Sequence, residues 1–331
     1  MSSTVETMAL SPSPTDGITC VRFSAGAEDN LLVSSWDCSV RVYDVPNNRL
    51  RLKMEIGNPV LAICYGSDKS EAFSGGLEGS IAQHNLDVPA NAHPSIGSHT
   101  KPVSCIRYDA SKGIVYSGSW DASVAAWDTK ASTKTPVMRL PQAGKVYSMS
   151  MHDHHLVVGT SAKQVALYDV RRNSDTPVET RDSPLKYQIR CVEILPDGSG
   201  YVVTTTEGRV GLEYFDAAKK GYAFKCHRQK IDETDTLVYP VNSVAFHPIF
   251  GTFATGGCDG IVNMWDGENK KRICQLAKFS SSVASMAFNH DGSKVAVAAS
   301  YTYEEGPKDQ QEDTVYVRAV QEADVRPKKK E

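Results

Sequence analysis

One short pattern of apolar residues recurs seven times along the chain and constrains the fold more than any other feature. Each copy has the form apolar-x-x-apolar-x-apolar, as in Val103, Ile106 and Tyr108. The steps between the first positions of successive copies are 42, 43, 43, 43, 52 and 42 residues. Those first positions are Ile18, Val60, Val103, Val146, Ile189, Val241 and Val283. A repeat of about 40–45 residues that fills a chain is typical of blades built from four antiparallel strands.

Each unit continues with the same order of signals. A second β-rich run leads to a tight turn that carries an acid, as in Trp120-Asp121, and six residues later an aromatic residue precedes aspartate, as in Trp127-Asp128. These signals predict an all-β fold, a seven-bladed WD-repeat β-propeller over residues 16–320. We expect residues 1–15 to supply the strand that closes the last blade, with Val5 to Leu10 beside Asp313 to Val320. Residues 321–331 would form a basic tail.

Composition narrows the range of partners. The chain has 331 residues and a formal net charge of −3, which favours neither nucleic acid nor a membrane surface. No apolar run approaches the roughly 20 residues of a membrane span, and the N-terminus lacks a signal-peptide pattern. The eight cysteines are scattered without a Cys-x-x-Cys pair, so they favour free thiols in a reducing compartment over disulfides or zinc ligands.

A serine, a histidine and an aspartate of the third unit resemble a hydrolase triad in composition. The spacing of His99, Ser117, Asp121 and Trp127 instead fits the buried hydrogen-bonded tetrad of a WD repeat. No nucleophile elbow or oxyanion motif accompanies these residues, as a hydrolase would need. We therefore expect the tetrad to hold a blade together.

No other motif indicates catalysis, a cofactor or a metal. The chain has no phosphate-binding Gly-rich loop, no His-Glu-x-x-His and no dinucleotide fingerprint. The cluster His152-Asp153-His154-His155 lies between two predicted strands, where these residues suit a tight turn. The basic run from Arg326 to Lys330 is either a nuclear localisation signal or a solvated end of the chain. We expect a protein that is not an enzyme.

The residue just before each turn acid should point from one face of the ring towards a partner. Exposed tryptophan is enriched in binding hot spots, so Trp36 and Trp120 are candidate anchors, together with Leu77. The alternative is that both tryptophans pack against loops of neighbouring blades. The residues just before the turn acids are Trp36, Leu77, Trp120, Thr206 and Cys258.

The fifth unit departs from the others. Glu213 stands where other units have tryptophan, six residues after Glu207. A buried carboxylate needs a cation, which Arg209 or Arg190 could supply. The same region also suits a basic pocket for carboxylates or phosphate, and the two interpretations are compatible. Further members of this candidate group are Lys186, Tyr187, Lys225, His227 and Arg228.

Several longer strings resemble the Bub-three family of mitotic-checkpoint proteins, from about Asp16 to Val320. They include Leu32-Val33-Ser34-Ser35-Trp36-Asp37, Leu185-Lys186-Tyr187-Gln188-Ile189-Arg190-Cys191, Glu207-Gly208-Arg209-Val210 and Tyr222-Ala223-Phe224-Lys225-Cys226-His227-Arg228. The resemblance implies a spindle-assembly-checkpoint adaptor that binds the acidic GLEBS segment of a Bub-type kinase and of its pseudokinase-like relative. It also implies recognition of phosphorylated Met-Glu-Leu-Thr-type repeats on an outer-kinetochore scaffold, recruitment of the kinases to kinetochores, and an indirect effect on the anaphase-promoting complex.

Residue roles follow from the same resemblance. The peptide-binding face would comprise Trp36, Leu77, Trp120, Tyr187, Arg190, Arg209 and Glu213, with Lys225 and Arg228 as candidate phosphate contacts. The protein would be a monomeric propeller within hetero-complexes, present in nucleus and cytoplasm and at kinetochores in mitosis. It would have no cofactor, and no membrane or nucleic-acid partner.

Three alternatives remain at this point. A related messenger-RNA-export WD protein uses a similar face for a nucleoporin GLEBS segment, although the balanced charge here favours the checkpoint branch. Tyr168-Asp169-Val170-Arg171 weakly resembles the box of a substrate receptor for a cullin-type ubiquitin ligase. A propeller enzyme would need a metal or a nucleophile at the ring axis.

Overall fold

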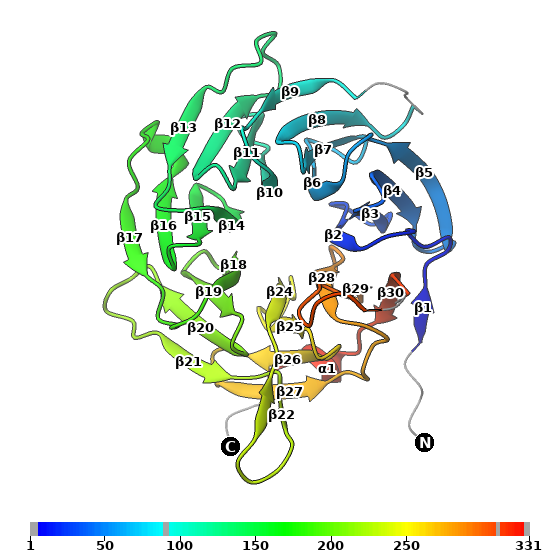
Figure 1. Ribbon diagram of the computed structural model, residues 1–331, viewed down its shortest axis with the longest axis vertical. Coiled ribbons are helices and arrows are strands. Elements are labelled where there is room, and N and C mark those ends of the chain that lie inside the picture. Colours follow the sequence, from blue (N-terminus) through cyan, green and yellow to red (C-terminus); the bar gives the residue numbers. More distant parts are fainter. Residues whose placement is uncertain (1–5, 89–92, 309–311, 328–331) are drawn as a thin grey trace.

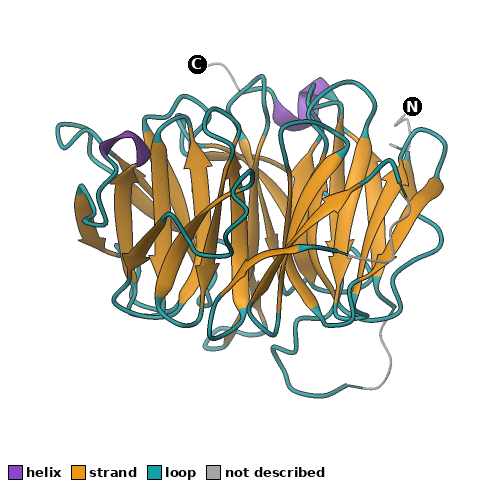
Figure 2. Cartoon of the chain, turned by 90° about the horizontal axis from the view of Figure 1, so that it is seen from above, coloured by secondary structure: helices purple, strands orange, loops and turns teal. Residues whose placement is uncertain are grey.

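The computed structural model describes residues 6–88, 93–308 and 312–327. Within these ranges the strands form seven four-stranded antiparallel sheets around a central axis and one two-stranded hairpin (Figure 1). From the side, the strands run between two faces of a disc, and loops cover both faces (Figure 2). The fold is therefore the seven-bladed propeller that the repeat predicts.

Each blade contributes one strand to each of four concentric positions. The innermost strands are β2 (Ile18–Phe23), β6 (Val60–Tyr65), β10 (Val103–Asp109), β14 (Val146–His152), β18 (Ile189–Ile194), β24 (Val241–Phe246) and β28 (Val283–Phe288). The second strands are β3 (Asn30–Ser35), β7 (Glu71–Gly76), β11 (Ile114–Ser119), β15 (His155–Thr160), β19 (Gly200–Thr205), β25 (Phe253–Gly257) and β29 (Lys294–Ala299). The third strands are β4 (Ser39–Asp44), β8 (Ser80–Asn85), β12 (Ser123–Asp128), β16 (Gln164–Asp169), β20 (Arg209–Tyr214), β26 (Val262–Asp266) and β30 (Thr314–Ala319). The outermost strands are β5 (Arg49–Glu55), β9 (Ser95–Ser98), β13 (Met138–Pro141), β17 (Glu179–Asp182), β21 (Tyr222–Lys225), β27 (Lys271–Gln275) and β1 (Thr7–Ala9).

The seventh blade takes its outermost strand from the other end of the chain. β1 pairs antiparallel with β30, with Thr7 opposite Arg318. Beyond the strand, the Leu10 N–H donates to the Val315 carbonyl at 2.9 Å, and the Leu10 side chain is buried. This pairing completes the last sheet and closes the ring. Val5, at the start of the predicted closing segment, lies outside the described residues.

The core lies between neighbouring blades rather than within one sheet. Ile18 and Tyr43 of the first blade share one apolar cluster with Leu10, Ala296 and Val317 of the seventh. Because each second strand has a blade on both sides, its residues are buried on both of its faces, as in all six residues of β19. Such strands are continuous apolar or small-residue runs instead of alternating ones.

One backbone hydrogen bond recurs in every blade and defines a face of the ring. The N–H of the residue before each turn acid, or of its counterpart, donates to the loop that leads into the same blade, at 2.8–3.1 Å. In the described residues these donor–acceptor pairs are Trp36–Gly17, Leu77–Pro59, Trp120–Pro102, Ser161–Lys145, Thr206–Gln188, Cys258–Pro240 and Ser300–Ser282. We call this side of the disc the turn face and the other side the opposite face.

A β-bulge also recurs at the turn-face end of each innermost strand. The register shifts between the first and third residues of the strand, which leaves the second residue unpaired. Bulges of this kind re-aim a side chain. The bulged residues are Thr19, Leu61, Ser104, Tyr147, Arg190, Asn242 and Ala284.

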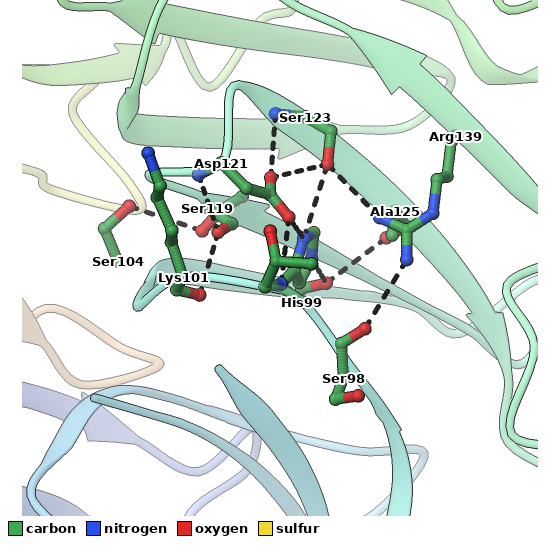
Figure 3. A network of polar contacts seen from close by, with 12 residues as sticks. Ser98, His99, Lys101, Ser104, Ser119, Asp121, Ser123, Ala125 and Arg139 are labelled. Atoms are coloured by element: carbon green, nitrogen blue, oxygen red, sulfur yellow. Dashed lines mark hydrogen bonds and ion pairs between the residues drawn. The ribbon is translucent and has the colours of Figure 1, made fainter. Parts of the chain in front are cut away.

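The predicted tetrad of the third blade is present. His99 Nδ1 lies 2.9 Å from Asp121 Oδ2, its Nε2 lies 2.8 Å from Ser117 Oγ, and Trp127 Nε1 donates to the same hydroxyl at 2.7 Å. Figure 3 shows His99 pointing to Asp121, whose carboxylate also accepts from Ser123. Ser117 is fully buried, so its hydroxyl serves the fold and is closed to a substrate.

A second tetrad lies in the sixth blade and corrects the sequence interpretation of His227. His227 Nδ1 is 2.9 Å from Asp259 Oδ1, its Nε2 is 2.8 Å from Thr255 Oγ1, and Trp265 Nε1 donates to Thr255 at 2.9 Å. His227 is buried and belongs to the scaffold, so its assignment to the candidate basic pocket was wrong. The hairpin of β22 (Arg228–Lys230) and β23 (Thr236–Val238) begins just after it and lengthens the spacing.

Other blades use different buried polar pairs. In the first blade Arg41 Nη2 lies 2.8 Å from Asp37 Oδ2, and both side chains are buried. In the second blade, His84 Nε2 lies 2.7 Å from Ser74 Oγ, and its Nδ1 lies 3.0 Å from His93 Nδ1. The third strands of these blades are thereby tied to their neighbours without tryptophan.

Two short helices lie at the opposite face, on the upper edge of Figure 2: the 3-10 helix η1 (Val170–Arg172) and α1 (Glu322–Val325). Val325 is buried, and its carbonyl accepts from Thr252 Oγ1 at 2.7 Å. No helix in the described ranges is long and apolar enough to cross a membrane. Lys328 to Lys330, the lysines of the basic run, lie outside these ranges.

Removing the indole donor of the tetrad should destabilise the fold. Trp127→Phe keeps most of the buried ring but deprives Ser117 of its hydrogen bond, so we expect the free energy of unfolding to fall by about 1–3 kcal/mol. Denaturant titration measures this loss. Trp265→Phe, which removes the matching bond in the sixth blade, is the paired test. Unchanged stability in both variants would contradict the structural role of the tetrads.

His84 should make stability depend on pH. Burial lowers the pKa of His84 to about 3, with a further contribution from His93. The unfolded pKa is about 6.5, so below that pH the unfolded chain binds a proton that the folded chain excludes. The contribution is complete above pH 6.5 and should fall by about 1.4 kcal/mol per pH unit below it. The free energy of unfolding of His84→Asn should decline less steeply between pH 6.5 and 5; parallel curves would exclude this role.

Candidate functional site

Apolar side chains of the turn face gather on the first three blades. The Trp36 side chain is 40% exposed, and its ring edge borders Gly17. Trp120 is half-buried, with Lys145 Nζ of the next blade 5.6 Å from its ring centroid. Leu77, between them along the ring, is also half-buried. Trp36 is thus open to a partner, whereas Trp120 is partly covered by a neighbouring loop.

The corresponding turn residues of blades five and six are different. Thr206 is half-buried. Cys258 is buried, and its thiol lies 3.3 Å from Thr302 Oγ1. Burial raises the pKa of the Cys258 thiol, so it stays protonated. The large apolar residues that precede the turn acids are therefore confined to one arc of the turn face.

Three cations lie near Glu207 at the turn-face end of the fifth blade, and one of them, Arg209, pairs with its carboxylate. Arg209 Nε lies 3.3 Å from Glu207 Oε1, and Arg228 Nη2 donates to the Glu207 carbonyl at 2.9 Å. Lys225 lies directly opposite Arg209 in the β20–β21 register, and its side chain is exposed. Like charges at opposed positions of two strands are destabilising on their own. We call Arg209, Lys225 and Arg228 the basic group; its excess positive charge suits an anionic ligand.

Arg190 stands at the bulge of β18, near the ring axis. Its Nε and Nη2 both donate to Asn242 Oδ1, at 3.1 and 2.8 Å. Asn242 Nδ2 in turn donates to the Val283 carbonyl at 3.1 Å. Arg190 is exposed, and among the described residues no carboxylate forms an ion pair with it. The amide therefore fixes the direction of the guanidinium without neutralising its charge.

Tyr187 lies in the loop that leads into the fifth blade. Its side chain is 50% exposed, and Lys186 Nζ lies 6.0 Å from its ring centroid. The Gln188 carbonyl of the same loop accepts from the Thr206 N–H, which ties the loop to the turn before Arg209. The loop thus adds an exposed aromatic ring to the fifth blade's part of the turn face.

The structure does not bring Glu213 into this site. Glu213 lies near the far end of β20, opposite Tyr201, towards the opposite face. Burial raises the pKa of Glu213, and Arg181 is the cation that opposes this shift. The interpretation that Arg209 or Arg190 neutralises it was wrong, because these arginines lie at the other end of the blade. Glu213 is a position of the scaffold rather than of the turn face.

Metal-ligating residue types are dispersed over residues 6–88, 93–308 and 312–327. These ranges contain no group of three or more His, Cys, Asp or Glu side chains arranged to hold a metal ion. In the weak ligase-receptor motif, Arg171 donates to Asp169 from Nε at 2.9 Å and from Nη2 at 2.6 Å. That arginine is already paired within its own turn.

Two residues of the site were missed in the sequence. Asn242 occupies the same place in its repeat as Arg190, so aligning the repeats would have placed both at the ring axis. Aligned repeats would also have placed Lys145 in the loop that leads into the fourth blade, next to Trp120. The roles of Asn242 and Lys145 depend on side-chain contacts with a neighbouring blade, and the spacing of the sequence repeat does not predict such contacts.

Comparisons with known proteins agree with this architecture. A family model described as "WD domain, G-beta repeat" matches residues 5–44, 93–128 and 224–266. The chain is 47% identical to "Mitotic checkpoint protein BUB3.1" of Arabidopsis thaliana, over 97% of this chain and 95% of the relative. It is 40% identical to "Mitotic checkpoint protein bub3" of Dictyostelium discoideum, over 93% and 92%. "mRNA export factor GLE2" of Chaetomium thermophilum is 31% identical, over 90% and 85%.

The similarity to checkpoint proteins runs through nearly the whole of each chain and is higher than that to the export factor. The chain therefore belongs to the Bub3 family of mitotic-checkpoint WD-repeat proteins.

Proposed function

We propose that the protein is a spindle-assembly-checkpoint adaptor that binds acidic and phosphorylated peptides through its turn face. Its ligands would be the acidic GLEBS segments of Bub-type kinases, including a pseudokinase-like relative, and phosphorylated repeats of a kinetochore scaffold. The observation that carries the proposal is the basic group: Arg209 pairs with the Glu207 carboxylate, Arg228 donates only to the Glu207 backbone carbonyl, and the exposed Lys225 lies opposite Arg209, so the group keeps an excess of positive charge. The names of the relatives support the checkpoint role.

The distribution of side chains favours ligands that are extended peptides. The exposed Trp36 belongs to the first blade, whereas the basic group belongs to the fifth and the segment that follows it. Arg190 stands between them near the ring axis. A segment that crosses the turn face could place an apolar residue on Trp36 and carboxylates on Arg190 and Arg209. Lys225 and Arg228, at the outer part of the basic group, are our candidates for the phosphate.

The proposal assigns the protein no catalytic role and no cofactor. It would act as a monomeric propeller within hetero-complexes, in nucleus and cytoplasm and at kinetochores during mitosis. By bringing kinases to the kinetochore it would influence the anaphase-promoting complex indirectly.

The messenger-RNA-export role is the second candidate, because the export factor is also related over most of its length. A pull-down from mitotic and interphase cells separates the two. The checkpoint proposal expects a Bub-type kinase in the eluate and a kinetochore scaffold from mitotic cells only. Nucleoporins and messenger ribonucleoprotein in both phases would replace it with the export role.

Arg209→Ala should weaken binding of a fluorescein-labelled GLEBS peptide. A hydrogen bond to a charged group contributes about 1.5–3 kcal/mol, so we expect the dissociation constant to rise roughly 10- to 100-fold in fluorescence anisotropy. Trp36→Ala should give a comparable loss through its apolar contact. Arg49→Ala, an exposed arginine at the opposite face, is the matched control. Unchanged affinity in a folded Arg209→Ala protein would remove Arg209 from the site.

The basic group should discriminate a phosphorylated scaffold peptide from the plain peptide. The phosphate adds about 1.5–2 negative charges at neutral pH, so we expect tighter binding that weakens as salt is raised. Lys225→Ala should reduce the preference for the phosphorylated form while leaving the plain peptide unaffected. Equal affinity of the native protein for both peptides would refute phosphate recognition.

A further inference from the structure

A hollow of about 530 Å³ opens on the opposite face between blades five and six. The turns that follow β18, β20, β24 and β26 form its walls. Its apolar lining includes Leu195, Phe246, Ile249, Phe250 and Phe253. The volume is within the range of about 300–1,000 Å³ that is typical of ligand sites. None of the turn-face residues lines it.

Comparison of the seven blades shows that this apolar surface belongs to the sixth. Each blade has a turn between its first and second strands at the opposite face. In the sixth blade the tip of that turn is Ile249-Phe250, and the Ile249 side chain is 68% exposed. The corresponding tips elsewhere carry short or charged residues, namely Gly26, Asp68, Ser111, Asp153, Asp197 and Asp291. The exposed apolar tip of the sixth blade is therefore not a feature that the repeat imposes, because the other six turns reach solvent with short or charged residues.

The turn that presents Ile249 is stiff. The N–H groups of Ile249 and Phe250 both donate to His247 Nδ1, at 3.3 and 3.2 Å, and Gly251 N–H donates to the His247 carbonyl. The His247 ring is buried and packs against Phe250 and Phe288. Burial lowers the pKa of His247, so Nδ1 remains an acceptor at neutral pH. A pre-ordered apolar residue loses little conformational entropy when a partner binds.

The rim of the hollow is acidic. Its ionisable lining residues in the described ranges are Asp197, Asp266, Glu268 and one cation, Lys219, whose Nζ lies 5.5 Å from the Tyr214 ring centroid. Asp197 Oδ1 accepts from Ser199 N–H and Oγ, at 2.9 and 2.7 Å. Asp266 is buried, and its carboxylate accepts from Asn269 N–H and Nδ2 at 2.9 and 2.7 Å. The exposed rim thus carries Asp197 and Glu268 against Lys219, a net negative charge that favours a cationic partner.

We propose that this hollow, with Ile249 at its edge and Asp197 and Glu268 on its rim, is a second docking site. Its occupant is a short segment of another protein that presents leucine-like side chains flanked by lysine or arginine. This ligand is opposite in charge to the acidic peptides of the turn face. The two faces of the ring can therefore hold different partners at once, and the docking site is independent of the proposed function.

The test uses the full chain and three fluorescein-labelled octapeptides: KSKLLKSK, its charge-reversed form ESELLESE and its apolar-deleted form KSKSSKSK. We expect anisotropy to detect only KSKLLKSK below about 500 μM, since a site of this size supports weak binding. Ile249→Ser and Glu268→Lys should each weaken it at least tenfold. Both residues are exposed, so the variants should keep the native thermal unfolding midpoint.

Turn-face variants serve as the matched controls. Arg209→Ala and Trp36→Ala should bind KSKLLKSK with native affinity, and an acidic turn-face peptide should not compete with it. If the native protein bound KSKLLKSK but no acidic peptide, the proposed function would be contradicted and the docking proposal would stand. The docking proposal fails if KSKLLKSK does not bind, if ESELLESE binds equally, or if Ile249→Ser retains native affinity.

Discussion

Closure of the ring is the constraint on which the remaining structure depends. Each blade buries both faces of its second strand against neighbours, so no blade could keep its core without the next one. The seventh blade would lack its outermost strand if β1 did not pair with β30. That pairing joins residues about three hundred positions apart and places the first and last blades around one apolar cluster, which includes Tyr43 and Val317. The turn-face residues of the first and sixth blades keep their relative positions only because the circle is complete.

Closure allows a repeated scaffold to carry an unrepeated surface. The leading-loop hydrogen bond and the bulge recur in every blade, so the same few positions always reach the turn face. The backbone makes these recurring contacts whatever the side chain, and some side chains at the bulge add a bond to the next blade, as Thr19 Oγ1 does to the Val60 carbonyl at 2.7 Å. Thr19, Tyr147 and Arg190 therefore share one position with different chemistry. The asymmetry of the turn face, apolar on one arc and cationic on the other, arises from side chains at equivalent positions.

The sequence predicts the scaffold well and the pairing of its charges poorly. The repeat spacing locates the seven blades, and the spacing of Asp121 and Trp127 identifies the tetrad of the third blade, because local periodicity determines both. Glu213 was misplaced because its neighbours depend on which end of a strand faces which side of the disc. His227 was assigned to the candidate basic pocket because ten inserted residues separate it from its tetrad partner Thr255 by more than the interval between His99 and Ser117. Contacts that cross blades, such as Arg190 with Asn242, depend on the closed ring and have no signal within one repeat.

Two segments differ from their counterparts in the other blades, the β22–β23 hairpin and the Ile249-Phe250 turn, and their positions show how such a fold gains binding sites without losing stability. The β22–β23 hairpin begins one residue after His227, whose bonds to Asp259 and Thr255 fix the preceding backbone. The insertion therefore leaves the tetrad intact and places Arg228 beside Glu207. On the other face, Ile249 and Phe250 occupy a turn whose backbone is already held by the buried His247. In both places a buried histidine makes the hydrogen bonds that hold the local backbone. The residues that follow it are then not needed for these bonds and can contact a partner. Structural and binding residues are thus adjacent in the chain but separate in their contacts, so a substitution at one need not disturb the other.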